Sequence, residues 1–234
     1  MILYGTIINV ICIIIGSFIG LLFFKVKDKY KETAMKGISL TVILIGLQMA
    51  LKADDFIIVL LSILSGALIG EWLKLESKMN AVGHWIEKRF SKSNSANISE
   101  GFITATLLFV IGAMAIIGAI ESGVSNNHSI LNTKAVIDGF SSFILTTTLG
   151  IGVIFSIIPV FLYQGAITLV ANYIINFIPE LMLDEIILQI TVVGGLLIVG
   201  LGLNLLNLTK IKVVNLLPSI VMVVIIVVVK QILI

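Results

Sequence analysis

The residues best able to do chemistry gather in one strongly apolar stretch, residues 137–155. Asp138, Ser141, Ser142 and Thr148 recur at spacings that place them on one side of a helix with about 3.6 residues per turn. A carboxylate among hydroxyls in an apolar segment is costly, and such a set is typical of a solute or ion pathway. Hydroxyls and small residues also pack helices together, so the pattern leaves both roles open.

Two amide side chains in other apolar stretches extend this set. Gln164 follows Pro159 within residues 157–177, and broken helices line binding sites in transporters. Asn9 shares one helix face with Cys12 and Gly16 in residues 2–24, which is also the pattern of a packing seam. The predicted substrate-binding residues are Asp138, Ser141, Ser142, Thr148, Gln164 and Asn9.

Composition places these residues in a lipid environment. Of 234 residues, 59% are apolar and 12% are charged, and the mean hydropathy is +1.18. A soluble domain carries about 25% charge and could not bury so much apolar surface. We therefore predict an all-α integral membrane protein, formed by residues 1–234 as one transmembrane domain.

Eight apolar segments are long enough to cross the bilayer, since a crossing helix needs about 20 residues. They are residues 2–24, 34–51, 55–73, 101–121, 137–155, 157–177, 185–206 and 213–230. The fifth and sixth together are also short enough for a re-entrant hairpin. Residues 75–90 carry an apolar stripe at helical spacing, which predicts an amphipathic helix on the cytoplasmic membrane surface.

Basic residues predict which side each loop faces, because cytoplasmic loops retain lysine and arginine. With both termini outside, the cytoplasmic loops hold twelve of the 15 basic residues, among them Lys25, Lys27 and Lys92. Lys134 is then assigned to an outer loop. The outer loops and helix ends are acidic, which favours a cationic or zwitterionic solute. The acids are Asp54, Asp55, Glu121, Asp138, Glu180, Asp184 and Glu185.

Matching motifs in the two halves of the chain predict an internal repeat. Gly5 and Gly16 match Gly101 and Gly112, and the dipeptide at Gly66-Ala67 matches Gly165-Ala166. A repeat of three spans is inverted, because the second copy starts on the opposite side. The prediction is a 3+3 inverted repeat (residues 1–92 and 99–178) followed by two extra helices (residues 183–234).

Several motifs resemble a known bacterial family. They are GTIINV (5–10), GAMAIIGAIESG (112–123), KAVIDGFSS (134–142), LGIGVIFS (149–156) and YQGAITL (163–169). In the same order through nearly the whole chain, they resemble the YdfK/YqgA-type membrane family, a family of unknown function. The resemblance implies a protein of the bacterial cytoplasmic membrane, often suspected of transport, without assigned substrate-binding or catalytic residues.

The sequence lacks the motifs of several activities. It has no Walker motif, no GxSxG and no HExxH, and its single cysteine belongs to no metal-binding pattern. We therefore expect no enzymatic activity, no cofactor and no metal. The expected partners are lipid and a small solute or ion, with no nucleic acid. The glycine pairs Gly16/Gly20 and Gly66/Gly70 would also allow a homo-oligomer.

Three functions agree with these observations. The leading prediction is a secondary transporter or exporter of a small polar solute or ion, working by alternating access. The first alternative is a membrane scaffold or regulator of a partner protein, which transports nothing. The second is a membrane enzyme, for which Asp138 with Glu121 is the only candidate pair.

Overall fold

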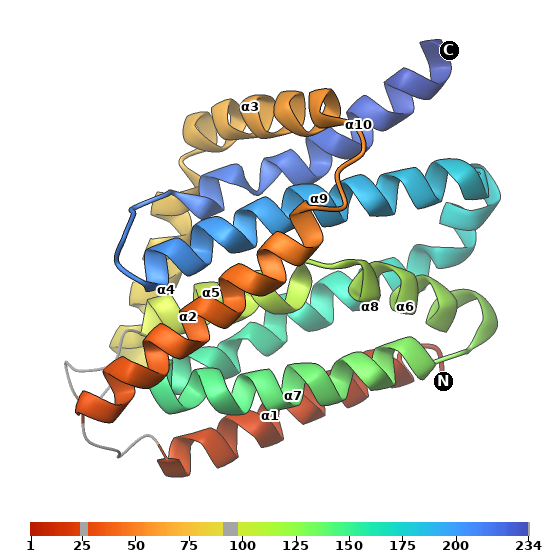
Figure 1. Ribbon diagram of the computed structural model, residues 1–234. Coiled ribbons are helices and arrows are strands. Elements are labelled where there is room, and N and C mark those ends of the chain that lie inside the picture. The colour runs from red at the N-terminus through yellow and green to blue at the C-terminus, as the bar shows by residue number, and fades with distance from the viewer. Residues whose placement is uncertain (24–27, 91–97, 234) are drawn as a thin grey trace. The chain divides into compact units, whose positions relative to one another are not determined.

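A computed structural model describes residues 1–23, 28–90 and 98–233 of the chain (Figure 1). Within these ranges every regular element is an α-helix or a short 3-10 helix, and no strand occurs. The all-α prediction is therefore confirmed. Lys25, Lys27 and Lys92, which helped to predict the orientation, lie outside the described residues.

The chain divides into two compact units. Unit 1 contains residues 1–38, 80–110 and 114–174, and unit 2 contains residues 39–79, 111–113 and 175–234. Helices α2 (Asp28–Ala50) and α4 (Leu75–Phe90) each contribute to both units. The predicted repeat boundaries, and the placement of α4 on the membrane surface, stay predictions.

Glycines bring two helices of unit 1 into close contact. Helix α1 (Tyr4–Phe23) packs along α7 (Ser129–Leu149), as Figure 1 shows. A methyl group on Gly16 would overlap the carbonyl oxygen of Gly139, and one on Gly20 would approach the Phe143 carbonyl oxygen to 2.6 Å. Small residues let membrane helices approach closely and gain dispersion energy over a long seam.

The apolar core of unit 1 lies where α1 and α7 meet three further elements. These are α5 (Ile98–Val110), the 3-10 helix η1 (Gly150–Ser156) and α8 (Ile157–Phe177). In Figure 1, α7 and α8 run in opposite directions and η1 makes the turn between them. The core side chains are Ile13, Ala105, Phe109, Leu145, Leu149, Val153 and Val160.

The predicted fourth span is divided in the structure. Residues 101–121 fall on α5 and on α6 (Ala113–Ser125), which are bent by 60° relative to each other. Gly112 lies at the break with φ of 141°, a conformation that other residues rarely adopt. Its counterpart in the predicted first copy, Gly16, lies inside the continuous helix α1.

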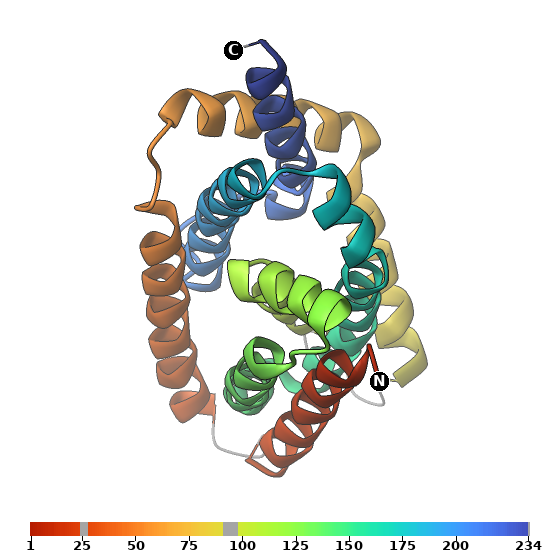
Figure 2. The same ribbon diagram turned by 90° about the vertical axis from the view of Figure 1, so that its right-hand side faces the viewer.

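Unit 2 is built on a second glycine seam. Helix α3 (Phe56–Leu73) packs against α10 (Pro218–Leu233) and the 3-10 helix η2 (Val213–Leu216), and α9 (Glu180–Leu205) packs on α10 (Figure 2). Gly66 lies against Ser219, and Gly70 lies against the backbone of Asn215. Both predicted glycine pairs therefore contact helices of the same chain, and a second copy would have to pack elsewhere.

Six helical stretches among the described residues are long and apolar enough to cross a membrane, or seven if α5 and α6 form one broken span. The predicted total of eight treats α7 and α8 as separate, whereas here they belong to one 49-residue stretch, Ser129–Phe177. At about 1.5 Å per residue, the 21 residues of each helix extend about 31 Å, which matches the hydrocarbon thickness. Each helix is therefore long enough to cross by itself, and the choice between two crossings and a re-entrant hairpin stays a prediction.

Asp55 stabilises the start of α3 and ties it to α10. Its Oδ1 accepts hydrogen bonds from the backbone N–H groups of Ile57 (3.1 Å) and Ile58 (3.3 Å), and its Oδ2 accepts one from Lys230 (3.2 Å). Lys230 also donates to Glu185 on α9 at 3.0 Å. Burial alone would raise the pKa of Asp55, but these hydrogen bonds and the charge of Lys230 together lower it.

We expect Asp55→Ala to lower the free energy of unfolding by about 0.5–2 kcal/mol, because two backbone N–H groups lose their acceptor. Asp55→Ser should recover part of this, since a hydroxyl also caps a helix. Because the folded-state pKa is lowered, the carboxylate stabilises the fold above about pH 4, and this is lost as pH falls through the folded pKa. Thermal unfolding in detergent, followed by circular dichroism at several pH values, measures both effects. Equal destabilisation by alanine and serine would contradict the capping role.

Candidate functional site

Four polar side chains meet inside unit 1, on three different helices. Asn9 lies on α1, Lys134 and Asp138 on α7, and Gln164 on α8. Asn9 and Gln164 are 0% exposed, Asp138 is 5% exposed and Lys134 is 6% exposed. We call these four residues the polar cluster. Three of them were predicted from the sequence as binding residues, although they lie up to 155 positions apart.

Hydrogen bonds connect the polar cluster through Asn9. Its Nδ2 donates to Asp138 Oδ2 at 3.0 Å and to Gln164 Oε1 at 3.2 Å. Lys134 Nζ donates to the same Asp138 oxygen at 2.5 Å, one helical turn away on α7. The cluster is therefore a buried ion pair extended by two amides.

The carboxylate determines how the two amides are oriented. An ionised carboxylate only accepts hydrogen bonds, so Asn9 must turn its Nδ2 donor towards Asp138. Gln164 must then turn its oxygen towards the same nitrogen. As a result, Asn9 Oδ1 and Gln164 Nε2 point elsewhere, and both are buried without a hydrogen-bond partner.

Two threonines continue this pattern along the same helix faces. Thr6 lies three residues before Asn9 on α1, and Thr168 lies four residues after Gln164 on α8, so each neighbours its amide on the helix surface. The hydroxyls of both are buried and lack a partner. Buried polar groups are normally satisfied, so the unpartnered atoms around this buried ion pair leave hydrogen-bonding capacity that a polar ligand or water could use.

The structure corrects the helix boundary predicted near the two charged residues. Helix α7 begins at Ser129, eight residues before the predicted start at 137, where the Asn127 side chain accepts a hydrogen bond from the Ser129 N–H. Lys134 is therefore not in an outer loop but inside the helix. Asp138 lies near the middle of α7, about 14 Å from its start and about 17 Å from its end.

The other predicted binding residues lie outside the cluster. Ser142 donates to the carbonyl oxygens of Ile13 and Gly139, which fastens α7 to α1. Thr148 donates to the Leu145 carbonyl within its own helix. Ser141 is half-buried and makes no side-chain hydrogen bond among the described residues. The first two hydroxyls already have acceptors, and a binding role for the three stays a prediction.

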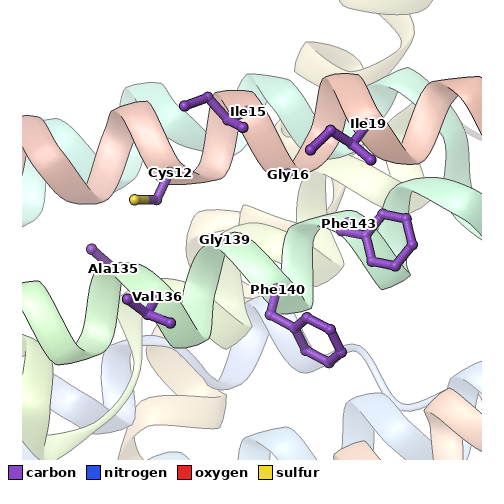
Figure 3. A pocket seen from close by; sticks show the side chains of 9 residues that line it. All are labelled: Cys12, Ile15, Gly16, Ile19, Ala135, Val136, Gly139, Phe140 and Phe143. Carbon is purple, nitrogen blue, oxygen red and sulfur yellow. The ribbon is translucent and has the colours of Figure 1, made fainter.

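A groove between α1 and α7 provides a contrast to the polar cluster (Figure 3). It has a volume of about 400 Å³ and is lined by apolar side chains with the sulfur of Cys12 and by glycines. Ile15 and Phe140 on its rim are 53% and 64% exposed, as expected of surfaces that face lipid. The groove offers nothing that would bind a polar solute, so the polar cluster is the better candidate site.

The fold and its buried charges define an α-helical membrane protein. Residues 4–228 match the family described as "Protein of unknown function (DUF554)", and the chain belongs to this family. It is 34% identical over 222 residues to the uncharacterized membrane protein YdfK of Bacillus subtilis (strain 168). The aligned residues cover 93% of this chain and 92% of the relative. It is 29% identical over 221 residues to the uncharacterized protein YqgA of Escherichia coli (strain K12), with 92% of each chain covered. The resemblance seen in the motifs is thus confirmed, and no solved structure matches the chain.

Proposed function

We propose that the protein is a secondary transporter or exporter of a small polar solute or ion, which works by alternating access and without covalent chemistry. The observation that carries this proposal is the polar cluster, a buried ion pair surrounded by unpartnered amide and hydroxyl groups within helices that are long and apolar enough to cross a membrane. Solute sites formed between helices of the membrane domain are characteristic of secondary transporters.

Energetics favour a functional role for the cluster over a structural one. Moving both charges out of water costs several kcal/mol per ion, and apolar residues of similar volume often pack as well or better. The unpartnered atoms of Asn9 and Gln164 add a further cost of about 1–3 kcal/mol each. A chain that needed only packing here would be more stable with apolar side chains.

The helices around the cluster differ in how tightly they are held. The α1–α7 seam is closed at Gly16 and Gly20, where a methyl group would overlap backbone atoms of α7, and a methyl group on Gly139 would lie only 3.0 Å from the Cys12 carbonyl oxygen. Next to Gln164 on α8, a methyl group on Gly165 would meet only the Leu3 side chain, at an ordinary 3.8 Å. On its other side α8 is held closely by α6, where a methyl group on Gly123 would overlap the Thr168 carbonyl oxygen. We infer that α1 and α7 move as one body and that α8 shifts against them together with α6 to open the cluster.

Uptake into proteoliposomes tests the proposal. Purified protein is reconstituted, and the entry of labelled amino acids, polyamines, small organic acids, Na⁺ and H⁺ is compared with that into empty liposomes. We expect saturable uptake of at least one compound, and loss of that uptake in Lys134→Met/Asp138→Asn, which removes the charges but leaves none unpaired. Gln189→Met, a buried glutamine of unit 2, serves as the control and should transport like the wild type.

Two results would each contradict a part of this proposal. One is correctly folded protein that moves none of the compounds, and the other is a double variant that transports as well as the wild type. The first would favour the alternative of a scaffold or regulator of a partner protein. The second would keep the function and move the binding site away from the polar cluster.

A further inference from the structure

We propose that the polar cluster binds a small zwitterion. The ligand's ammonium group would be held by Asp138 and Asn9 Oδ1, and its carboxylate by Lys134 and Gln164 Nε2. This inference rests on the proposed function and adds the chemical class of the solute.

The charge balance of the cluster is the first argument. Lys134 lies 2.5 Å from Asp138, so the two charges cancel. A bound cation would leave one net positive charge in the membrane interior, and a bound anion one net negative charge, each at a cost of several kcal/mol. A zwitterion leaves the total charge at zero. The acidic outer loops agree with either a cationic or a zwitterionic solute. The ion pair of Lys134 with Asp138 favours the zwitterion, because it makes the cluster neutral.

The unpartnered atoms are the second argument, because they complement the two ends of a zwitterion. Asn9 Oδ1 is a free acceptor, which an ammonium group can satisfy, and Gln164 Nε2 is a free donor, which a carboxylate can satisfy. The hydroxyls of Thr6 and Thr168, both unpartnered, can serve either end. A zwitterion therefore carries a matching group for each of the two orphaned amide atoms of the cluster.

The ion pair itself argues against an uncharged ligand. A neutral amide could use the orphaned acceptor and donor, but it would have no need of two full charges held in the interior. Lysine carries its ammonium on a flexible four-carbon stem, so Lys134 can turn away from Asp138 while a ligand enters between them. Hydrogen bonds to charged groups contribute about 1.5–3 kcal/mol each, which favours a charged ligand over a neutral one.

The test compares compounds that differ only in charge. Thermal unfolding and isothermal titration calorimetry of wild-type protein in detergent are measured with glycine, L-alanine and L-glutamine as zwitterions. Ethylamine, propionate and propionamide supply the cation, the anion and the neutral amide. We expect a concentration-dependent rise in Tm with at least one zwitterion and none with the three analogues.

Two glutamine variants locate the binding. Gln164→Met removes the orphaned donor at nearly constant volume and should weaken zwitterion binding about 10- to 100-fold. Gln189→Met changes a glutamine that is equally buried but belongs to unit 2, and it should bind with wild-type affinity. Equal affinity in both variants would overturn the assignment.

The remaining outcomes separate this inference from the proposed function. Stabilisation by ethylamine, propionate, propionamide or Na⁺ instead of the zwitterions would overturn the solute class and keep a transporter. If no zwitterion raises the Tm but another compound is taken up into proteoliposomes, the solute class is again overturned and the transporter is kept. Absence of both binding and uptake would overturn the proposed function as well.

Discussion

Lys134→Met is expected to lower the free energy of unfolding by about 3–5 kcal/mol, the largest effect of any single substitution considered. Removing one partner of a buried ion pair leaves the other charge uncompensated in a medium of low polarity. Within the described part of the chain, the Asp138 side chain would keep a single hydrogen bond, the one from Asn9 Nδ2. Thermal or denaturant unfolding in detergent, monitored by circular dichroism, measures the loss.

The double variant Lys134→Met/Asp138→Asn is the matched control. It removes both charges together and keeps the side-chain volumes, so it should recover most of the stability lost in the single variant. Solute binding should stay absent in the double variant, because the charges themselves are needed. If the single and double variants are equally unstable, packing and not the unpaired charge would explain the loss.

Gly16→Ala should destabilise the protein by about 1–3 kcal/mol, the range found for overpacking a well-packed core. Its new methyl group would overlap the carbonyl oxygen of Gly139 and the hydroxyl of Ser142. The carbonyl is backbone and cannot rotate away, so α1 would have to separate from α7. That separation would also break the hydrogen bond from Ser142 to the Ile13 carbonyl, 3.0 Å long.

Gly165→Ala is the control for this substitution, since it makes the same change in a helix where the methyl group fits. Alanine favours helix over glycine by about 1 kcal/mol, so this variant should be neutral or slightly stabilised. Unfolding of both variants beside the wild type provides the comparison. A loss of similar size in both would mean that helix propensity or solvation, not the α1–α7 seam, governs these positions.

Part of the site could be predicted from side-chain chemistry alone. Asn9, Asp138 and Gln164 stand out because polar groups in apolar segments need partners, and the structure brings these three together. Lys134 was missed because a basic residue near a helix end is read as part of a loop. Its spacing of four from Asp138 is the signal that could have placed both on one helix.

Ser141, Ser142 and Thr148 show the limit of such reasoning. A hydroxyl in an apolar helix can donate to a carbonyl of the preceding turn, as Thr148 does, or to a neighbouring helix, as Ser142 does. Both arrangements have the same sequence pattern as a binding site. Only the positions of the neighbouring helices distinguish them.

Composition and hydrophobic length suffice to predict an all-helical membrane protein, because burial in lipid restricts the residues of every crossing helix. The family is indicated separately, by the motifs that resemble its members. They do not show that α7 begins at Ser129, that Gly112 bends the chain between α5 and α6, or that Lys134 neutralises Asp138. Those features depend on which helices touch, and contact is decided by close packing between segments far apart in the chain. The charge of the site, and with it the solute class that we infer, therefore follows from the tertiary structure.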